Sequence, residues 1–286
     1  MWLLFAFLSA GFAGITAILA KIGVRDIDSD LATALRTSVV LVFAWLMALL
    51  SGGIREIGTL SAQSLLFLML SGLSTGASWI CYFKALQMGR VNRVAAVDKS
   101  STVLTIVLAA LLFGEPFTWL TAVCAVTLLA GTLLMLQKSP EESTSPEKSS
   151  WLLYAVLSAL FASLTTILGK LGVESVDSNL ATAIRTIFVL LMAWGIVFAG
   201  KKQKGIHSIS RKNSLFLCLS GIATGLSWLC YYRALKDGIA GIVAPVDKLS
   251  ILLTAVFSKW VLHEPFGKRA VIGLLLLTAG TLGLLL

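Results

Sequence analysis

Charged side chains inside long apolar stretches are the residues of this sequence best suited to chemistry. They form two matching sets: Arg36, Asp98 and Lys99 in the first half of the chain, and Arg185, Asp247 and Lys248 in the second. A charge is costly to bury in an apolar medium, so each of these residues is a functional candidate by default. Their opposite signs predict an arginine–aspartate bond within each set, which a low dielectric would strengthen. The alternative is a static role, in which the arginines extend towards water and the helix dipole stabilises the aspartates.

Hydroxyl and aromatic side chains form a second pair of matching sets. The sets are Thr75, Ser78, Trp79 and Tyr82, and Thr224, Ser227, Trp228 and Tyr231. Their spacing places the hydroxyl-bearing residues of each set on one face of a helix, with a tryptophan adjacent. We expect these faces to line a cavity that binds an amphipathic or cationic molecule through stacking and cation–π contacts. The alternative is that the rings only fill the space between helices or anchor them at the membrane interface.

The elements that carry these residues are predicted to be transmembrane helices. The chain is 57% hydrophobic and 13% charged, whereas a soluble domain carries about 25% charged residues. A helix that crosses a bilayer needs roughly 20 apolar residues. Ten such runs lie near 2–20, 31–51, 65–86, 94–113, 118–137, 151–169, 180–200, 215–235, 242–262 and 269–286. The runs are continuous, which favours helices over the alternating strands of a β-barrel.

Several local signals mark the ends and contacts of these helices. Three pairs of charged residues lie at predicted helix ends: Asp28 and Asp177, Glu115 and Glu264, and Lys21 and Lys170. We expect the aspartates to cap helix N-termini, the glutamates to hydrogen-bond within tight turns before proline, and the lysines to extend to the interface. GxxxG pairs at Gly72 and Gly76, and at Gly221 and Gly225, predict close helix approach.

An internal repeat organises the whole chain. Residues 2–137 align without a gap with residues 151–286, so that "DSDLATALRT" at 28–37 becomes "DSNLATAIRT" at 177–186. We therefore expect two units, 1–137 and 151–286, joined by a polar linker at 138–150. A unit of five helices ends on the side of the membrane opposite its start. The fold predicted is thus an all-α integral membrane protein of ten transmembrane helices, arranged as two inverted five-helix repeats.

The net charge of +9 also fits a membrane protein. Most lysines and arginines outside the spans fall in loops on the side of the linker, which predicts a cytoplasmic linker and both termini outside. This asymmetry explains the basic charge better than nucleic-acid binding does. The four cysteines have no metal or disulfide spacing, and no cofactor is expected.

The repeated motifs resemble the EamA-type family of the drug/metabolite transporter superfamily. They are "SWICYFKAL" and "SWLCYYRAL" at 78–86 and 227–235, "VDK" at 97–99 and 246–248, and "EPF" at 115–117 and 264–266. The resemblance implies a ten-helix, alternating-access carrier in the bacterial inner membrane, often an exporter, in which a monomer suffices as a fused pseudo-dimer. Related small multidrug resistance proteins carry a glutamate in the first helix. The equivalent segments here, 10–20 and 159–169, contain no acidic residue, which argues against that mode of proton coupling.

The function expected is secondary transport of a small organic metabolite or drug-like compound, in the direction of export. The two charged sets would then be gates at opposite mouths, each closed by its arginine–aspartate bond while the other is open. A facilitator or uptake carrier, and a non-transporting receptor or assembly subunit, are the alternatives. The spans hold no clustered catalytic set, which disfavours an enzyme, and the paired symmetry suits a carrier better than a channel.

Overall fold

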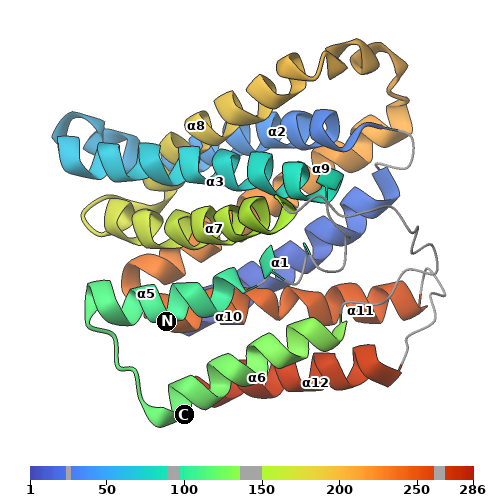
Figure 1. The fold of residues 1–286 in the computed structure, drawn as a ribbon. Coiled ribbons are helices and arrows are strands. Elements are labelled where there is room, and N and C mark those ends of the chain that lie inside the picture. The colour runs from blue at the N-terminus through green and yellow to red at the C-terminus, as the bar shows by residue number, and fades with distance from the viewer. Residues whose placement is uncertain (24–26, 89–93, 95–96, 99, 136–149, 261–267) are drawn as a thin grey trace.

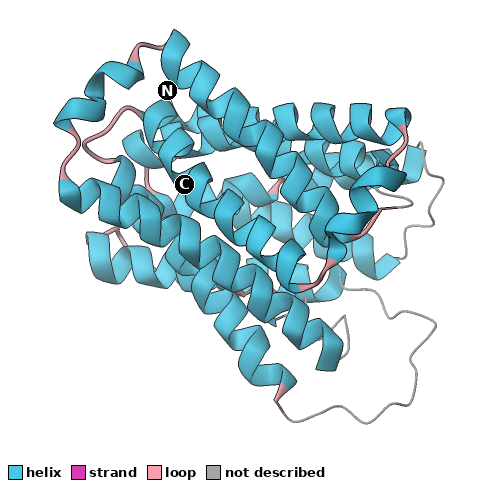
Figure 2. Ribbon diagram, turned by 90° about the horizontal axis from the view of Figure 1, so that it is seen from above, coloured by secondary structure: helices cyan, strands magenta, loops and turns pink. Residues whose placement is uncertain are grey.

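The computed structural model of the chain describes all residues except 24–26, 89–93, 95–96, 99, 136–149 and 261–267. Helices joined by short turns make up the described part (Figures 1 and 2). The α-helices are α1 (Trp2–Gly23), α2 (Ser29–Leu50), α3 (Ala62–Met88), α5 (Ser101–Phe113), α6 (Trp119–Met135), α7 (Trp151–Val173), α8 (Ser178–Ala199), α9 (Arg211–Asp237), α10 (Ala240–Lys248), α11 (Ser250–Trp260) and α12 (Lys268–Gly283). The 3-10 helices η1 (Gly53–Thr59) and η2 (Lys202–Ser208) follow α2 and α8.

Six of these helices are long and apolar enough to cross a membrane. They are Trp2–Ala20 within α1, all of α2, Ala62–Tyr82 within α3, and all of α7, α8 and α9; α5, α6 and α12 contain shorter apolar segments. Large apolar side chains point outward, among them Leu111 at 75% exposed and Val42 at 71%. Such a surface requires an apolar surrounding medium.

Aspartates begin the second helix of each half, as predicted. Asp28 Oδ1 accepts hydrogen bonds from the amides of Asp30 and Leu31 at 3.0 and 3.3 Å. Asp177 Oδ1 accepts from the amides of Asn179 and Leu180, both at 3.1 Å. Both aspartates therefore satisfy amides that the first helical turn leaves without partners.

The span predicted over 242–262 is corrected by the structure, because two helices occupy it. α10 ends at Lys248 and α11 begins at Ser250, so the described part of the chain contains eleven α-helices rather than ten. Pro245 lies inside α10 and has no amide hydrogen to donate to the preceding turn. At the junction the Leu249 amide bonds to the Val246 carbonyl at 3.0 Å, a tight 3-10 turn. Asp247 and Lys248 consequently end a short helix instead of beginning a long one.

The equivalent region of the first half is only partly described. Val94, Val97 and Asp98 are helical, and α5 begins at Ser101. Lys99 lies outside the described residues, as does the predicted linker except for Ser150.

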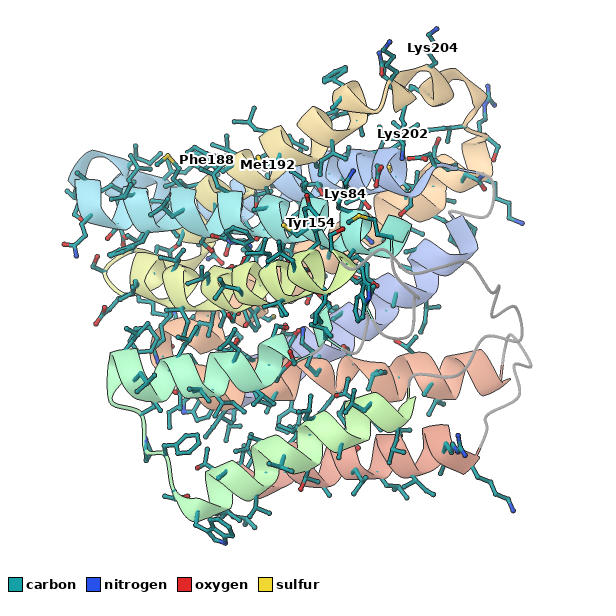
Figure 3. All side chains as sticks on the ribbon, in the orientation of Figure 1. Lys84, Tyr154, Phe188, Met192, Lys202 and Lys204 are labelled. Atoms are coloured by element: carbon teal, nitrogen blue, oxygen red, sulfur yellow. The ribbon has the colours of Figure 1, made fainter. Side chains whose placement is uncertain are left out.

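Helices of the first half pack mainly against helices of the second. α1 lies against α9, α3 against α7, α2 against α8 and α6 against α12. Gly72 of α3 sits so close to α8 that a Cβ there would lie 2.7 Å from the Cβ of Phe188; Gly221 of α9 stands in the same relation to Val39 of α2. Figure 3 shows Phe188 and Met192 along α8 beside α3. The close approach predicted from the GxxxG pairs is confirmed.

Candidate binding cavity

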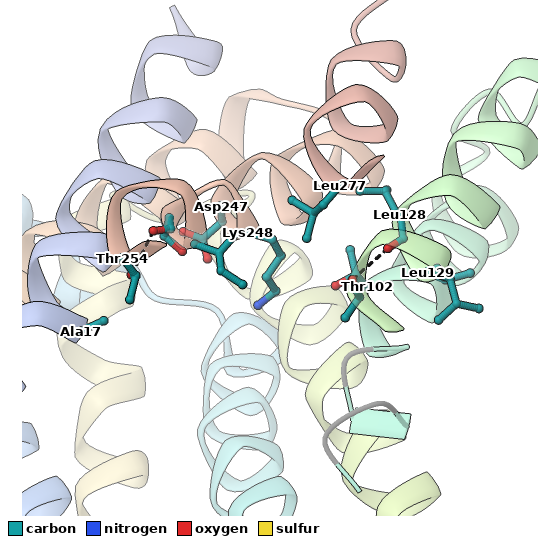
Figure 4. Close-up of a pocket in the computed structure, with 13 residues that line it drawn as sticks. Ala17, Thr102, Leu128, Leu129, Asp247, Lys248, Thr254 and Leu277 are labelled. Atoms are coloured by element: carbon teal, nitrogen blue, oxygen red, sulfur yellow. Dashed lines mark hydrogen bonds between the residues drawn. The ribbon is translucent and has the colours of Figure 1, made fainter. Parts of the chain in front are cut away.

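Two adjoining cavities lie between the helices. The first, which we term the central cavity, has a volume of about 300 Å³ and is lined by α1, α3, α7, α8, α9 and α10. The second, the side cavity, has about 350 Å³ and is lined by α1, α5, α6, α10, α11 and α12 (Figure 4). Ala13, Asp247 and Lys248 line both. The two spaces therefore meet at the end of α10.

Arg185 is the most deeply buried charge of the central cavity, at 3% exposed. Its Nε donates to Ser71 Oγ at 3.0 Å, and its Nη2 donates to Thr75 Oγ1 at 2.5 Å. The guanidinium also lies over two rings, 5.1 Å from the centroid of Trp228 and 4.9 Å from that of Tyr232. Within the described residues, no carboxylate comes within 4.0 Å of it. Hydroxyls and ring faces, rather than an anion, hold this cation.

Serines bind the aspartate of each half in the same way. Ser9 Oγ donates to Asp247 Oδ1 at 2.7 Å, and Ser158 Oγ donates to Asp98 Oδ1 at 2.7 Å. Ser227 Oγ in turn donates to the Ser9 carbonyl at 3.1 Å. Each aspartate is thus bound to the first helix of its own or the other half across the bundle, in an arrangement that recurs with the repeat.

Six of the eight hydroxyl and aromatic residues singled out from the sequence line the central cavity. They are Thr75, Ser78, Trp79, Ser227, Trp228 and Tyr231. Tyr82 instead packs beside Ala85 and Val94. Thr224 Oγ1 donates to the Ser220 carbonyl at 2.7 Å and does not line this space.

Of the charged sets, the second reaches the central cavity and the first does not. Arg185, Asp247 and Lys248 line it, whereas Arg36 and Asp98 lie elsewhere. The predicted bonds Arg36–Asp98 and Arg185–Asp247 are both absent among the described residues in this conformation. The physical reason is that serines satisfy both aspartates, while Arg185 turns to Ser71 and Thr75.

The cavity also contains residues that the sequence reasoning missed. Thr165, Thr166 and Tyr232 line it, and Thr166 Oγ1 lies 3.0 Å from the Tyr231 hydroxyl. The signal was available, because "TT" at 165–166 departs from "TA" at the equivalent 16–17, and Tyr232 replaces Phe83. These differences between the repeats marked the half whose polar groups face the cavity.

A second missed feature joins Glu115 to Lys170. Lys170 Nζ lies 2.9 Å from Glu115 Oε1 and donates to the Gly238 carbonyl at 2.7 Å. The Glu115 carboxylate also accepts from the amides of Ala240 and Gly241 at 2.7 and 2.8 Å, at the start of α10. Lys170 is therefore paired rather than extended to water. Glu115 does hydrogen-bond at a turn, but it joins three segments of the chain.

The central cavity contains two cations and one carboxylate among its described lining residues, and no cluster of three or more metal-ligating side chains occurs within the described ranges. The chemistry that these groups can perform is reversible binding of a polar solute. Their position among long apolar helices places that binding within the depth of a membrane.

Comparisons with known proteins agree with this geometry. The model of the EamA-like transporter family matches residues 1–137 and 149–286. An uncharacterized transporter in the cobO 3'region of a Sinorhizobium species is 44% identical over 133 residues, covering 46% of this chain and 94% of that protein. The uncharacterized transporter YxxF of Bacillus subtilis (strain 168) is 23% identical over 226 residues, covering 77% of this chain and 70% of that protein.

One solved crystal structure shares the fold, with a TM-score of 0.80 at 17% identity, covering 99% of this chain and 97% of that one. At this identity the likeness concerns the fold alone. The family match extends over nearly the whole chain and agrees with the apolar helices and the polar cavity between them. The protein is a multi-pass membrane transporter that belongs to the EamA-like transporter family.

Proposed function

We propose that the protein is a secondary transporter that exports a small organic metabolite or drug-like compound across the bacterial inner membrane by alternating access. The observation that carries this proposal is the central cavity, which gathers charged, hydroxyl and aromatic groups among apolar helices. Its lining comes from α1 and α3 in the first half and from α7 to α10 in the second. A site between two halves opens to either side when one half moves against the other.

The halves are proposed to be the units 1–137 and 151–286, joined by the linker 138–150, with the second unit inverted. Three observations support this. The serine–aspartate contacts recur with the repeat. Both termini lie at one side of the bundle in Figure 1. α1 begins at that side, whereas α7 begins at the opposite one.

The linker side is proposed to be cytoplasmic and both termini outside. The charges of the 3-10 helices support this, because η2 carries Lys202 and Lys204 where the equivalent η1 carries Gly53 and Arg55. Basic residues are retained on the cytoplasmic side of a membrane. Lys202 and Lys204 lie at the end of the bundle away from the termini (Figures 1 and 3).

The gate on the Arg185 side is proposed to be the bond from Arg185 to Ser71 and Thr75. In the opposite conformation, Arg36 would bond in the same way to the equivalent Ser220 and Thr224. This replaces the arginine–aspartate gates expected from the sequence. Asp98, Asp247, Lys99 and Lys248 remain candidates for the same step, because they share the predicted helix break in each half.

Transport in proteoliposomes tests the function. The purified protein is first screened by thermal shift against metabolite and drug-like libraries, and each stabilising compound is then assayed for counterflow with and without a pH gradient. We expect saturable uptake that trans-loaded compound accelerates. Binding without transport would support a receptor or assembly subunit instead, and transport unaffected by any ion gradient would identify a facilitator.

Thiol labelling tests the inversion. Arg36→Cys and Arg185→Cys are placed separately in a background without the native cysteines Cys81, Cys124, Cys218 and Cys230. Each is exposed to a membrane-impermeant maleimide in vesicles of both orientations. We expect the two positions to react from opposite sides, and reaction from the same side would refute inverted halves.

A further inference from the structure

The deepest cation of the central cavity has unused binding capacity. Arg185 carries five N–H donors, and its two printed bonds, to Ser71 and Thr75, use two of them. Both acceptors are neutral hydroxyls. A buried cation without an anionic partner is costly, so the structure holds at this position a charge that an anion would neutralise.

A second cation faces the same space. Lys248 lines both cavities and, within the part of the chain described, forms no ion pair with an acidic side chain. Figure 4 shows its amine end extending away from Asp247 into the open middle of the side cavity. Asp247 is already bound by Ser9. The meeting point of the cavities therefore has an excess of positive charge.

The aromatic faces are arranged against a cationic solute. Arg185 lies over the rings of Trp228 and Tyr232, so a second cation at those faces would have to displace it and would be repelled by it. The sequence suggested amphipathic or cationic solutes because the rings alone were visible there. The structure adds that a resident guanidinium already occupies two of them.

The side cavity offers an apolar extension. Ala17, Leu128, Ile251 and Leu277 line it, together with a few threonine hydroxyls such as Thr102. Volumes of about 300 and 350 Å³ lie at the small end of the roughly 300–1,000 Å³ typical of ligand sites. The space fits a compact molecule with one polar end.

We propose that the transported solute is a small organic anion, whose carboxylate binds between Arg185 and Lys248 and whose apolar body occupies the side cavity. This inference rests on the proposed function and adds the substrate class. A planar carboxylate matches the paired donors of a guanidinium, and such charge-assisted bonds are stronger than neutral ones.

Binding of matched probes to the detergent-purified full chain tests the proposal. The probes are 3-phenylpropionate, hexanoate, 3-phenylpropionamide and 3-phenylpropylamine, which vary charge and body separately. We expect the carboxylates to bind by calorimetry and raise Tm, and the amide and the amine to bind at least about tenfold more weakly.

Variants of the two cations locate the site. Arg185→Gln and Lys248→Gln should each weaken carboxylate binding by about tenfold or more, while Arg185→Lys retains part of it. Arg55→Gln, at an exposed position in η1, is the matched control and should bind as the parent does. Gel filtration and Tm identify any variant that fails to fold, and the Lys248 variant then carries the test.

The outcomes separate this inference from the proposed function. Equal or tighter binding of the amine or the amide, no binding of either carboxylate, or unchanged carboxylate binding in both Gln variants overturns the anion assignment. Saturable counterflow of a cationic or neutral compound would do so while leaving the carrier intact. Absence of saturable transport for every stabilising compound would overturn the carrier function, whatever the binding data.

Discussion

Arg36 and Arg185 occupy equivalent positions in the two halves, yet their surroundings differ. Arg185 is buried and bound to Ser71 and Thr75, whereas within the described residues the guanidinium of Arg36 forms no hydrogen bond or ion pair. The equivalents of the two hydroxyl partners are present, as Ser220 and Thr224, but Thr224 bonds to the Ser220 carbonyl and to Thr16.

The difference therefore lies in conformation rather than in residue type. The serine–aspartate contacts are the same in both halves, so the frame is shared and only the arginine contacts are unequal. An alternating carrier requires this combination, because one mouth is closed by contacts that the other lacks. The comparison predicts that equivalent substitutions in the two halves have unequal effects.

The largest effect is expected from Arg185→Met. Loss of its charge-assisted bonds should lower solute binding and transport by about 10- to 100-fold. Tm should stay within about 2 °C of the parent, because the substitution also removes a buried charge without an anionic partner. Arg36→Met should bind solute as the parent does while transport slows, since Arg36 acts in the opposite conformation. Equal loss of binding in the two variants would mean that the arginines have the same role.

Substitution of Glu115 ranks second. Glu115→Gln removes the ion pair with Lys170 and weakens two bonds to the start of α10, so we expect a loss of about 2 kcal/mol in stability, below the cost of breaking a fully buried pair. A double-mutant cycle with Lys170→Met, read as denaturation midpoints in detergent, should give a coupling of about 1–2 kcal/mol. Glu264→Gln is the repeat-equivalent control. A coupling near zero would show that the two side chains are neighbours without being partners.

The hydroxyl pairs give a smaller contrast. Ser71→Ala with Thr75→Val removes the acceptors of a charged donor and should cost about 1–2 kcal/mol. Ser220→Ala with Thr224→Val removes neutral bonds only and should cost less. Thermal unfolding of both double variants measures this, and equal costs would contradict an unequal engagement of the arginines.

The smallest effect concerns pH at the end of α2. Burial acts to raise the pKa of Asp28, but the hydrogen bond from Lys202 and the amides of Leu31 and Asp30 outweigh it and lower the pKa below 3.8. The contribution of Asp28 to stability is therefore present above pH 3.8 and is lost as the pH falls through the lowered value.

The hydrogen bond to Asp30 raises the pKa of Lys202 above 10.5, and its contribution is lost only as the pH rises beyond that raised value. These side chains are 35–40% exposed at the Lys202–Asp28 contact, so Lys202→Met should change Tm at pH 7 by no more than about 2 °C. A larger drop would mean that η2 depends on this contact for its position.

The sequence allowed the helices and their caps to be predicted because those features depend on local signals. Asp28 and Asp177 precede long apolar runs, and an N-terminal turn needs such acceptors. The helix approach at Gly72 and Gly221 was also predictable, since small residues at i, i+4 spacing leave room for a neighbouring helix. The break at Leu249 was missed because Pro245 was read as part of a continuous apolar run.

The site was predictable in residue type but not in pairing. Trp228 and Ser227 were placed in the cavity by their spacing alone. The choice of Arg185 between Asp247 and two hydroxyls depends on how helices from distant parts of the chain meet, and no local pattern encodes that. The contact between Glu115 and Lys170 was hidden for the same reason, because its partners come from different halves.

The crossing of α6 and α12 restricts how the molecule can move. A Cβ at Gly131 would lie 2.6 Å from the backbone nitrogen of Leu277, and one at Gly280 would lie 3.0 Å from the carbonyl oxygen of Cys124. Main chain rests on main chain here, with no flexible side chains between to absorb a displacement. This line of contact behaves as an axle about which the remaining helices tilt, so a bulky residue introduced there would jam the cycle far from the cavity itself.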